Sequence, residues 1–344
     1  MDRRVRDAVF QCTGAIVGAG FASGREIMRF FSRYGSFSWI GIGLAAAVMG
    51  IFAFALMKKA REANVISLSQ LCRAYLGPAG IAGSIAFTIL LGATGGSMSA
   101  AAGELGALSI PVHGAYWILL LASLVTGILL SARSLSPLAF MGSLLVPSLI
   151  LVFLLCLIPP EGKAVTDQAL LPVWRKAVEV VLFGISYGAM NITLAAGVLC
   201  EIGRGTPPKK ALHISVYLAL CVAGLLSLGN VVLLRQPQLI DAALPMVMLL
   251  NAFGKVGYWL AIVGLYLAVY TTLMAVARGM INIIGPCKPG WLGFALTAAL
   301  FLVFAIIGFD RLVGIIYPVL GIMCLFLLLW IITSGLSVRK GQKK

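Results

Sequence analysis

The chain has little charge and very little histidine. Only 11% of its 344 residues are Asp, Glu, Lys or Arg, and it contains two histidines. Soluble domains carry about a quarter charged residues and roughly half apolar residues, whereas 61% of this chain is hydrophobic. A soluble globular protein is therefore excluded, and the composition predicts a polytopic membrane protein.

The sequence also lacks the patterns of metal centres, disulfide scaffolds and enzymes. Its seven cysteines are scattered without CxxC spacing, so neither disulfides nor a structural metal site is expected. The two histidines, His113 and His213, fall on opposite sides of the predicted membrane, and no intramembrane Asp pair or Ser/His dyad is visible. We therefore expect no enzymatic activity and no organic cofactor.

Apolar runs of roughly 17 to 25 residues, the length that spans a bilayer, divide the chain into ten segments. This predicts an all-α membrane protein whose residues 1–344 form a single transporter domain. The segments lie near residues 8–32, 37–57, 80–107, 114–131, 137–158, 175–199, 211–234, 255–284, 290–308 and 311–335.

The 26 Lys and Arg residues are divided unequally between the two sides of these segments. Seventeen fall on the side that carries both termini and nine on the other side. Because cytoplasmic loops carry the excess of Lys and Arg, both termini are predicted to be cytoplasmic in a cell membrane. The net charge of +15 comes from short loops and chain ends rather than from a basic domain, so a nucleic-acid partner is not expected.

Two connections are expected to be structured. Apolar residues recur at helical spacing between Ser67 and Leu76, which predicts a short amphipathic helix at the cytoplasmic surface, capped by Ser67. The external stretch from Gln236 to Gly254 is too short, and too interrupted by proline, to cross the bilayer. We expect a helical lid that dips toward the external mouth.

Glycine interrupts two of the apolar segments. The first segment carries four glycines in the eleven residues from Gly14 to Gly24, and the sixth carries the string Phe183–Asn191. A break at bilayer depth is tolerated only where protein or a water-filled cavity covers it. The alternative is that these small residues pack one helix against another.

The number of segments places these two interruptions at equivalent positions. Ten segments divide into two fives, near residues 8–158 and 175–335, and because five is odd the second half enters the membrane from the opposite side. Segments one and six are then equivalent positions of an inverted repeat. Broken helices at such paired positions are the sequence indication of a transporter's binding site near the midplane.

Three strings resemble a known family. Gly14–Gly20 resembles the unwound first helix of the amino acid–polyamine–organocation (APC) superfamily, which shares the five-plus-five LeuT fold, and Val17–Glu26 looks like the signature of the YkvI-type membrane proteins. Phe183–Gly188 is similar to the second unwound region of that fold. Ala268–Thr272 resembles the pattern that completes a sodium site shared within the family.

The resemblance implies one sodium ion, the expected coupling ion, between segments one and eight. Its ligands would be backbone carbonyls and hydroxyls, an all-oxygen shell that a small hard cation favours. The alternative is that the hydroxyls bond carbonyls of their own helix. The implied ligands are the carbonyls of Gly14, Val17 and Ala268 and the hydroxyls of Thr271 and Thr272.

Other positions depart from the sodium-coupled pattern. Phe21 stands where symporter relatives carry an amide side chain, and Gly184 replaces a hydroxyl ligand, so a second sodium ion is not expected. Some proton-coupled relatives place a lysine of segment five at the shared cation position. The run Pro137–Ile158 has no lysine, which weakens a proton-coupled alternative without removing it.

A solute site is predicted beside the first break. The amides of Gly18, Ala19 and Gly20 would lie at the positive end of a half-helix and suit a carboxylate. Small residues of segment three would form the facing wall, or would only pack helices. The remaining lining residues are predicted to be Phe21, Ser186, Tyr187 and Tyr270, with Gly92, Thr94, Gly95, Ser97 and Met98 on the facing wall.

Three charged residues are candidates for gating or coupling. The resemblance implies that Arg25, one turn outward of the break, and Asp310, at the start of segment ten, close the outer path as a pair. Asp310 could instead pair with Arg311 or cap its own helix. Glu26, an intramembrane carboxyl, has either a coupling role or a nearby Arg as its buried partner.

The function that these observations favour is secondary active transport. We expect a small organic solute, an amino acid or related carboxylate, to move by alternating access with sodium coupling. A ligand-sensing receptor or channel subunit on the same fold remains an alternative, because fold does not fix function. The sequence does not indicate an oligomeric state.

The predicted topology can be tested by cysteine labelling. Cysteines introduced at Lys163 and Lys209 should react with impermeant thiol reagents from opposite sides of the membrane, because one span, the segment near residues 175–199, separates these two loops. Labelling of both from one side would contradict the segment assignment.

Overall fold

The computed structural model describes residues 3–131, 136–158, 172–240, 242, 244–284 and 290–335. Within these ranges the regular structure consists of α-helices, short 3-10 turns and one π-helical stretch. The expected all-α class is confirmed. Lys163, chosen above for labelling, lies outside these residues.

The predicted segments coincide with helices along the whole chain. The first half contains α1 (Arg3–Ile16), α2 (Ala19–Ala22), α3 (Arg25–Phe30), η1 (Ser32–Phe37), α4 (Ser38–Ala63), α5 (Leu68–Leu76), η2 (Gly77–Ala79), α6 (Gly80–Ser109), α7 (Ala115–Ser131) and α8 (Ser136–Leu155). The second half contains α9 (Val173–Leu194), α10 (Ala196–Arg204), α11 (Pro208–Leu234), η4 (Pro237–Leu239), α12 (Pro245–Leu250), η5 (Asn251–Phe253), α13 (Gly254–Ile284), α14 (Gly290–Ala305), α15 (Phe309–Arg311), η6 (Leu312–Ile316, π-helical) and α16 (Tyr317–Thr333).

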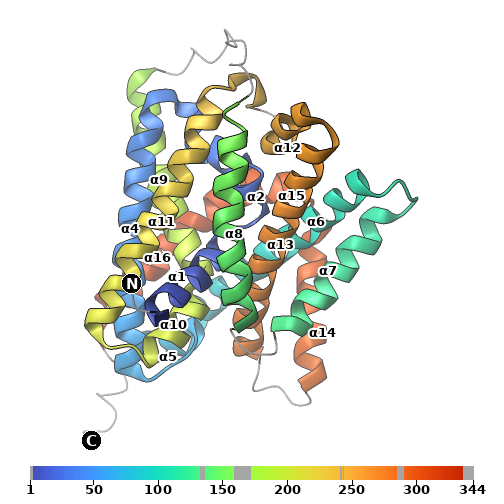
Figure 1. Cartoon of the computed structure of the whole chain (residues 1–344). Helices are drawn as coiled ribbons and strands as arrows, with labels where there is room; N and C mark the ends of the chain where they lie inside the picture. Colours follow the sequence, from blue (N-terminus) through green and yellow to red (C-terminus); the bar gives the residue numbers. More distant parts are fainter. Residues whose placement is uncertain are drawn as a thin grey trace, which may run out of the picture.

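Six helical stretches in the described part of the chain are long and apolar enough to cross a membrane, and three shorter helices are apolar as well. In Figure 1, α8 and α13 run side by side through the molecule, and α7 and α14 lie at one edge, both packed against α6. The chain is therefore a multi-pass membrane protein. The count of ten spans and the inverted repeat stay predictions.

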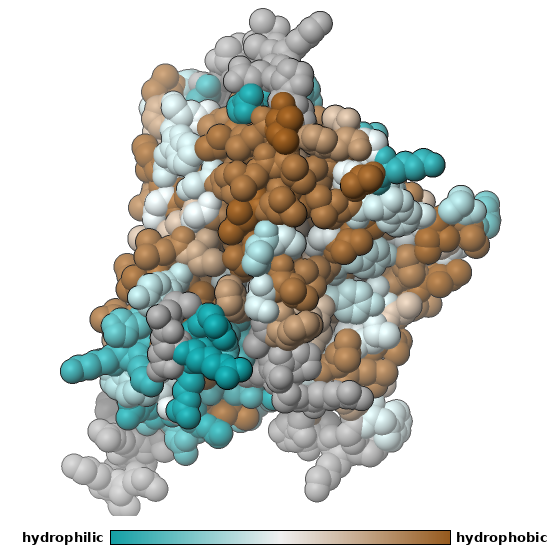
Figure 2. Space-filling model, viewed as in Figure 1, coloured by the Kyte–Doolittle hydropathy of each residue, from teal (hydrophilic) through white to brown (hydrophobic). Residues whose placement is uncertain are grey.

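The outer surface is apolar. Large aliphatic and aromatic side chains such as Ile51, Phe140 and Phe326 expose about two thirds of their area. Figure 2 shows hydrophobic residues over most of the upper and central part of one face, with hydrophilic residues gathered at the lower left. Apolar patches of this extent indicate contact with lipid or another protein.

Contacts show at which end of the bundle the described chain begins and ends. At one end Lys59 Nζ donates to the Ser334 carbonyl at 2.8 Å, and Arg61 Nη1 donates to the Thr206 carbonyl at 3.3 Å. The start of α1 borders the turn between α10 and α11 at this same end. The described chain thus begins and ends on one side, as an even number of spans requires. Which side faces the cytoplasm stays a prediction.

Both expected connecting helices are present. The amphipathic one is α5, and the Ser67 hydroxyl caps it by accepting a hydrogen bond from the Gln70 amide at 3.3 Å. The predicted lid contains η4, α12 and η5. It reaches the first segment, because the Met246 amide donates to the Ser23 carbonyl at 3.0 Å.

The predicted interruption of the first segment is confirmed. The α-helix ends at Ile16, Gly18 is extended (φ −96°, ψ −171°), and α2 starts at Ala19. A second interruption follows at Gly24, whose φ of 84° lies in the left-handed region that favours glycine. The outer half of this segment is therefore two short helices joined by a sharp turn.

The predicted interruption at Phe183–Asn191 is wrong. Helix α9 runs through this string without a break, and the helix is interrupted only at Ala195. The glycines serve close packing instead: a Cβ on Gly184 would lie 2.6 Å from the Gly41 carbonyl oxygen, and one on Gly188 would lie 2.8 Å from the carbonyl oxygen of Ala45 in α4. Small residues bring α9 and α4 together here, as the alternative reading had it.

This packing predicts that two Gly→Ala variants differ in stability. Gly184→Ala should destabilise the protein by about 1–3 kcal/mol, because its methyl group would overlap backbone that cannot move without separating two helices. Gly264→Ala should not, since the added Cβ in α13 would make only an ordinary contact, 3.8 Å from Val152. Thermal unfolding of the purified variants measures both, and equal unfolding temperatures would contradict the packing role.

Candidate functional site

The first break lies against α13, where the sodium site was predicted. The Thr272 hydroxyl donates to the Gly14 carbonyl at 3.3 Å, across two helices, and the Thr271 hydroxyl donates to the Ala268 carbonyl at 3.0 Å within its own helix. Both threonines are buried. The structure therefore brings Gly14 and Thr272 together, whereas the Thr271 bond to Ala268 is the contact within one helix that the alternative expects. Val17 directly follows the end of α1. Cation binding itself stays a prediction.

The amide end of α2 faces methionine. The Ala19 amide donates to the Met98 sulfur at 3.4 Å, and a Cβ on Gly18 would lie 3.0 Å from the same atom. Thioether sulfur is a weak acceptor. A ligand oxygen would satisfy this amide better than Met98 does, so the predicted carboxylate position remains chemically reasonable at Gly18 and Ala19.

Glu26 occupies the other side of the break. Its side chain is 3% exposed, folds back against Gly20, and accepts a hydrogen bond from the Tyr187 hydroxyl at 3.2 Å. A Cβ on Gly20 would overlap the carboxyl group. The alternative of a nearby arginine partner is not realised among the described residues, because Arg25 points to Asp310 instead.

Three buried hydroxyls meet beside this carboxyl. Tyr317 interacts electrostatically with Glu26, and its hydroxyl interacts with the hydroxyls of Thr94 and Ser97. All three side chains are at most 1% exposed. Sequence reasoning did not name Tyr317; its only signal was a Tyr–Pro pair within an aliphatic segment.

Three predicted lining residues are directed elsewhere. Phe21 stacks on Phe153 of α8 with 6.5 Å between ring centroids, and the Tyr270 hydroxyl lies 3.0 Å from the Thr126 hydroxyl of α7. Ser186 donates to the Pro318 carbonyl of α16 at 3.2 Å. These side chains join helices in this conformation, and their contact with a solute stays a prediction.

The glycines of α6 also pack helices. A Cβ on Gly92 would lie 3.0 Å from Leu300 of α14, and one on Gly95 would overlap the Phe301 ring. The residues predicted to form the facing wall therefore lie on two different faces of α6. Its glycines contact α14, whereas Thr94, Ser97 and Met98 are the wall residues that lie near the first segment and α16.

The expected outer pair is formed. Arg25 donates to Asp310 Oδ1 through Nε at 3.0 Å and through Nη2 at 2.7 Å. The remaining guanidinium nitrogen donates to the carbonyls of Ile240 and Ala242 in the lid, at 3.3 and 3.1 Å. Arg25 is 17% exposed and Asp310 57%. One side chain thus joins the first segment, the lid and the last segment at the outer end.

A second ion pair closes the opposite end. Arg278 of α13 donates to both carboxylate oxygens of Glu201 in α10, at 3.1 and 3.2 Å, and to the Ser131 carbonyl at 3.1 Å. Sequence reasoning missed this pair, because 77 residues separate its members. The structure is therefore tied by charged side chains at both ends.

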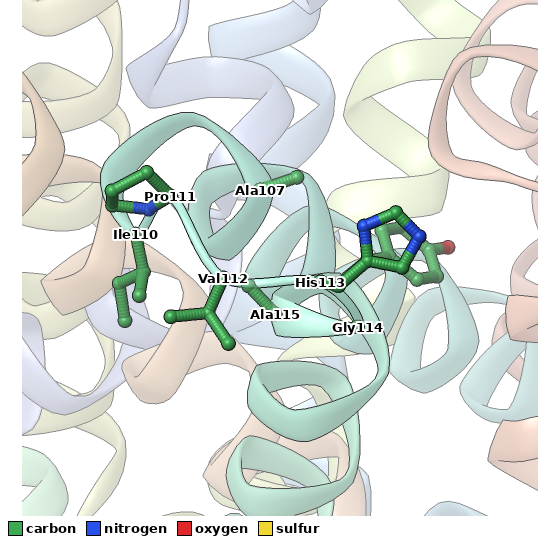
Figure 3. Close-up of a pocket in the computed structure, with 8 residues that line it drawn as sticks. Ala107, Ile110, Pro111, Val112, His113, Gly114 and Ala115 are labelled. Atoms are coloured by element: carbon green, nitrogen blue, oxygen red, sulfur yellow. The ribbon is translucent and has the colours of Figure 1, made fainter.

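A surface hollow of about 350 Å³ lies at the turn between α6 and α7. Figure 3 shows His113 and Val112 projecting from this turn, with Ile110 and Pro111 beside them. The hollow contains none of the predicted site residues, so it is separate from the buried cluster around Glu26. No group of three or more His, Cys, Asp or Glu side chains among the described residues could hold a metal ion.

No family model matches the chain. The uncharacterized membrane protein YkvI of Bacillus subtilis (strain 168) is 24% identical over 323 residues, which cover 92% of each chain. Two mutants of the Eremococcus coleocola manganese transporter have TM-scores of 0.63 and 0.64 at 14% identity, with 95% of this chain and 78% of theirs covered. The nucleobase-cation-symport-1 family transporter Mhp1 has a TM-score of 0.61 at 11% identity, with 92% and 74% covered.

These solved structures are LeuT-fold membrane transporters rather than enzymes. At 11–14% identity the likeness shows the fold alone. The chain therefore has a LeuT-type transporter fold, with a lipid bilayer as its environment. Its similarity to YkvI extends over nearly the whole length, whereas membership of the APC superfamily stays a prediction.

The outer ion pair predicts non-additive variants. Arg25→Ala and Asp310→Ala should each slow solute uptake several-fold and expose the outer cavity to thiol reagents, because a charge-assisted pair is worth about 1.5–3 kcal/mol. The double variant should be no worse than either single one, since both remove the same interaction. Arg175→Ala, which breaks an exposed pair with Glu179, is the control. Fully additive effects would show that the two residues do not act as one gate.

Proposed function

We propose that this protein is a secondary active transporter of a small organic solute, an amino acid or related carboxylate, that works by alternating access. The observation that carries the proposal is the broken first segment. Near the break, the Gly14 carbonyl accepts a hydrogen bond from Thr272 of α13, and the buried carboxyl of Glu26 packs against Gly20 and accepts a hydrogen bond from Tyr187. Such an arrangement, on ten spans with an inverted repeat, is how transporters build a midplane site.

Sodium is the proposed coupling ion. The carbonyls of Gly14 and Ala268 and the two threonine hydroxyls supply only oxygen, in a buried position between two helices. An ion there would tie the inner half of the first segment to α13. Its binding energy would then depend on the conformation of the break, which is what coupling requires.

A proton-coupled transporter is the second candidate, and Glu26 is the observation that favours it. A buried carboxyl at the break, without a cationic partner among the described residues, is the kind of intramembrane group that carries protons in transporters. Uptake driven by a pH gradient without sodium would support this candidate. Solute binding without flux would support a receptor or channel subunit.

Reconstituted vesicles test the coupling. An inward sodium gradient should drive accumulation of radiolabelled amino acids, and an equal potassium gradient should not. Thr271→Ala/Thr272→Ala should abolish the sodium dependence, because it removes two oxygens of the shell. Thr297→Ala is the matched control, since this buried hydroxyl bonds the Gly293 carbonyl within α14. An unchanged sodium response in the double variant would remove the sodium site.

A further inference from the structure

A second surface hollow, of about 300 Å³, lies at the end of the bundle where the described chain begins and ends. One wall is the first helix, α1, which contributes Arg4, Asp7 and Gln11. The other wall is the turn between α10 and α11, which contributes Thr206 and Lys210. Ligand pockets in proteins begin at about 300 Å³, so the hollow is large enough for a small polar group. None of the proposed solute, cation or gate residues lines it.

The two stretches of chain that form this hollow are basic. Residues 3–16 and 201–214 contain six basic residues, Arg3, Arg4, Arg6, Arg204, Lys209 and Lys210. Their carboxylates belong to Asp7 and Glu201. Asp7 pairs with the neighbouring Arg6 at 3.3 Å, and Glu201 pairs with Arg278 of α13 at 3.1 Å. Figure 2 shows hydrophilic residues gathered at the lower left, where α10 lies in Figure 1. A surface with charge of one sign concentrates counter-ions, so the hollow favours an anion.

An apolar, exposed stripe of α11 leads away from the hollow. Lys210 lines the hollow, and Tyr217, seven residues further on, lies on the same face of the helix. Tyr217, Leu220 and Val231 continue this face and are 43%, 63% and 37% exposed. Tyrosine is enriched at the headgroup level of bilayers. A ligand with a charged head in the hollow and a hydrocarbon tail would therefore cover this stripe, whereas a soluble anion would leave it uncovered.

We propose that the hollow binds the phosphate group of an anionic phospholipid, whose acyl chains lie along the Tyr217 face of α11. Arginine and lysine are the side chains that bind phosphate in proteins, and basic pockets between membrane helices hold phospholipid headgroups. A phosphatidylcholine headgroup fits less well, because its positive choline would meet the same basic side chains. A bound anionic lipid would join the start of α1 to the start of α11. Such a site is independent of the solute and of the coupling ion.

The test compares headgroups and chains separately. The purified full-length protein in a neutral detergent is heated with phosphatidylglycerol, with phosphatidylcholine of the same acyl chains, or with soluble glycerol 3-phosphate. Phosphatidylglycerol should raise the unfolding temperature above its value in phosphatidylcholine, because a ligand stabilises the folded state that it binds. Glycerol 3-phosphate, which lacks the chains, should leave that temperature unchanged. Added salt should reduce the effect of phosphatidylglycerol, because salt screens exposed charges.

Variants then locate the effect. Arg4→Gln/Lys210→Gln removes the two basic side chains that line the hollow and should weaken phosphatidylglycerol binding roughly 10- to 30-fold. Asp7→Asn removes the carboxylate from the wall and should strengthen binding by about 2- to 5-fold. Lys58→Gln/Arg73→Gln is the matched control, because it removes two exposed basic charges outside the hollow, and it should leave the affinity nearly unchanged. If the first variant does not fold, Asp7→Asn still decides the question.

Four results would overturn the lipid site. Equal stabilisation by phosphatidylglycerol and phosphatidylcholine would show that the headgroup charge is not recognised. Equal stabilisation by glycerol 3-phosphate would assign the hollow to a soluble anion. The same loss of affinity in the control as in Arg4→Gln/Lys210→Gln would show that the charge of the whole surface, rather than this hollow, attracts the lipid. Unchanged or weaker binding in Asp7→Asn would show that the phosphate does not lie beside this carboxylate.

Discussion

A peptide group inside a bilayer has no water to bind, so every N–H and C=O that a helix releases must find another partner. The two interruptions of the first segment, at Val17–Gly18 and at Gly24, release several such groups, and their partners come from three distant elements. The Gly14 carbonyl accepts a hydrogen bond from the Thr272 hydroxyl, and the Ala19 amide donates one to the Met98 sulfur. The Ser23 carbonyl accepts a hydrogen bond from the Met246 amide. The positions of α13, α6 and α12 around the first segment follow from this requirement.

Glycines predicted the break in the first segment correctly, but they also predicted a break at Phe183–Asn191 that the structure does not have. The string Gly14–Gly24 frees backbone, whereas Gly184 and Gly188 lie in an unbroken helix that presses on α4. A glycine permits either outcome, because the same missing side chain allows unusual dihedral angles and close approach. Which one occurs depends on the facing helix, and Gly41 in α4 cannot be paired with α9 from one sequence alone.

Backbone motifs were therefore easier to place than side chains. The strings in segments one and eight correctly predicted that Gly14 and Thr272 lie side by side, but the directions of Phe21 and Tyr270 depend on helix rotation. Tyr317 was missed for a related reason. The π-helical stretch Leu312–Ile316 inserts a wider turn just before it, which rotates the residues that follow relative to a regular helix. Such bulges have no reliable signature in an aliphatic run.

The guanidinium of Arg25 joins three elements with one rigid group. Its planar fork binds Asp310 on one edge and two lid carbonyls on the other. The lid and the start of the last helix have no hydrogen bond to each other among those described here, yet both are bonded to this one guanidinium. Movement of either element away from the first segment therefore has to break contacts of the same side chain.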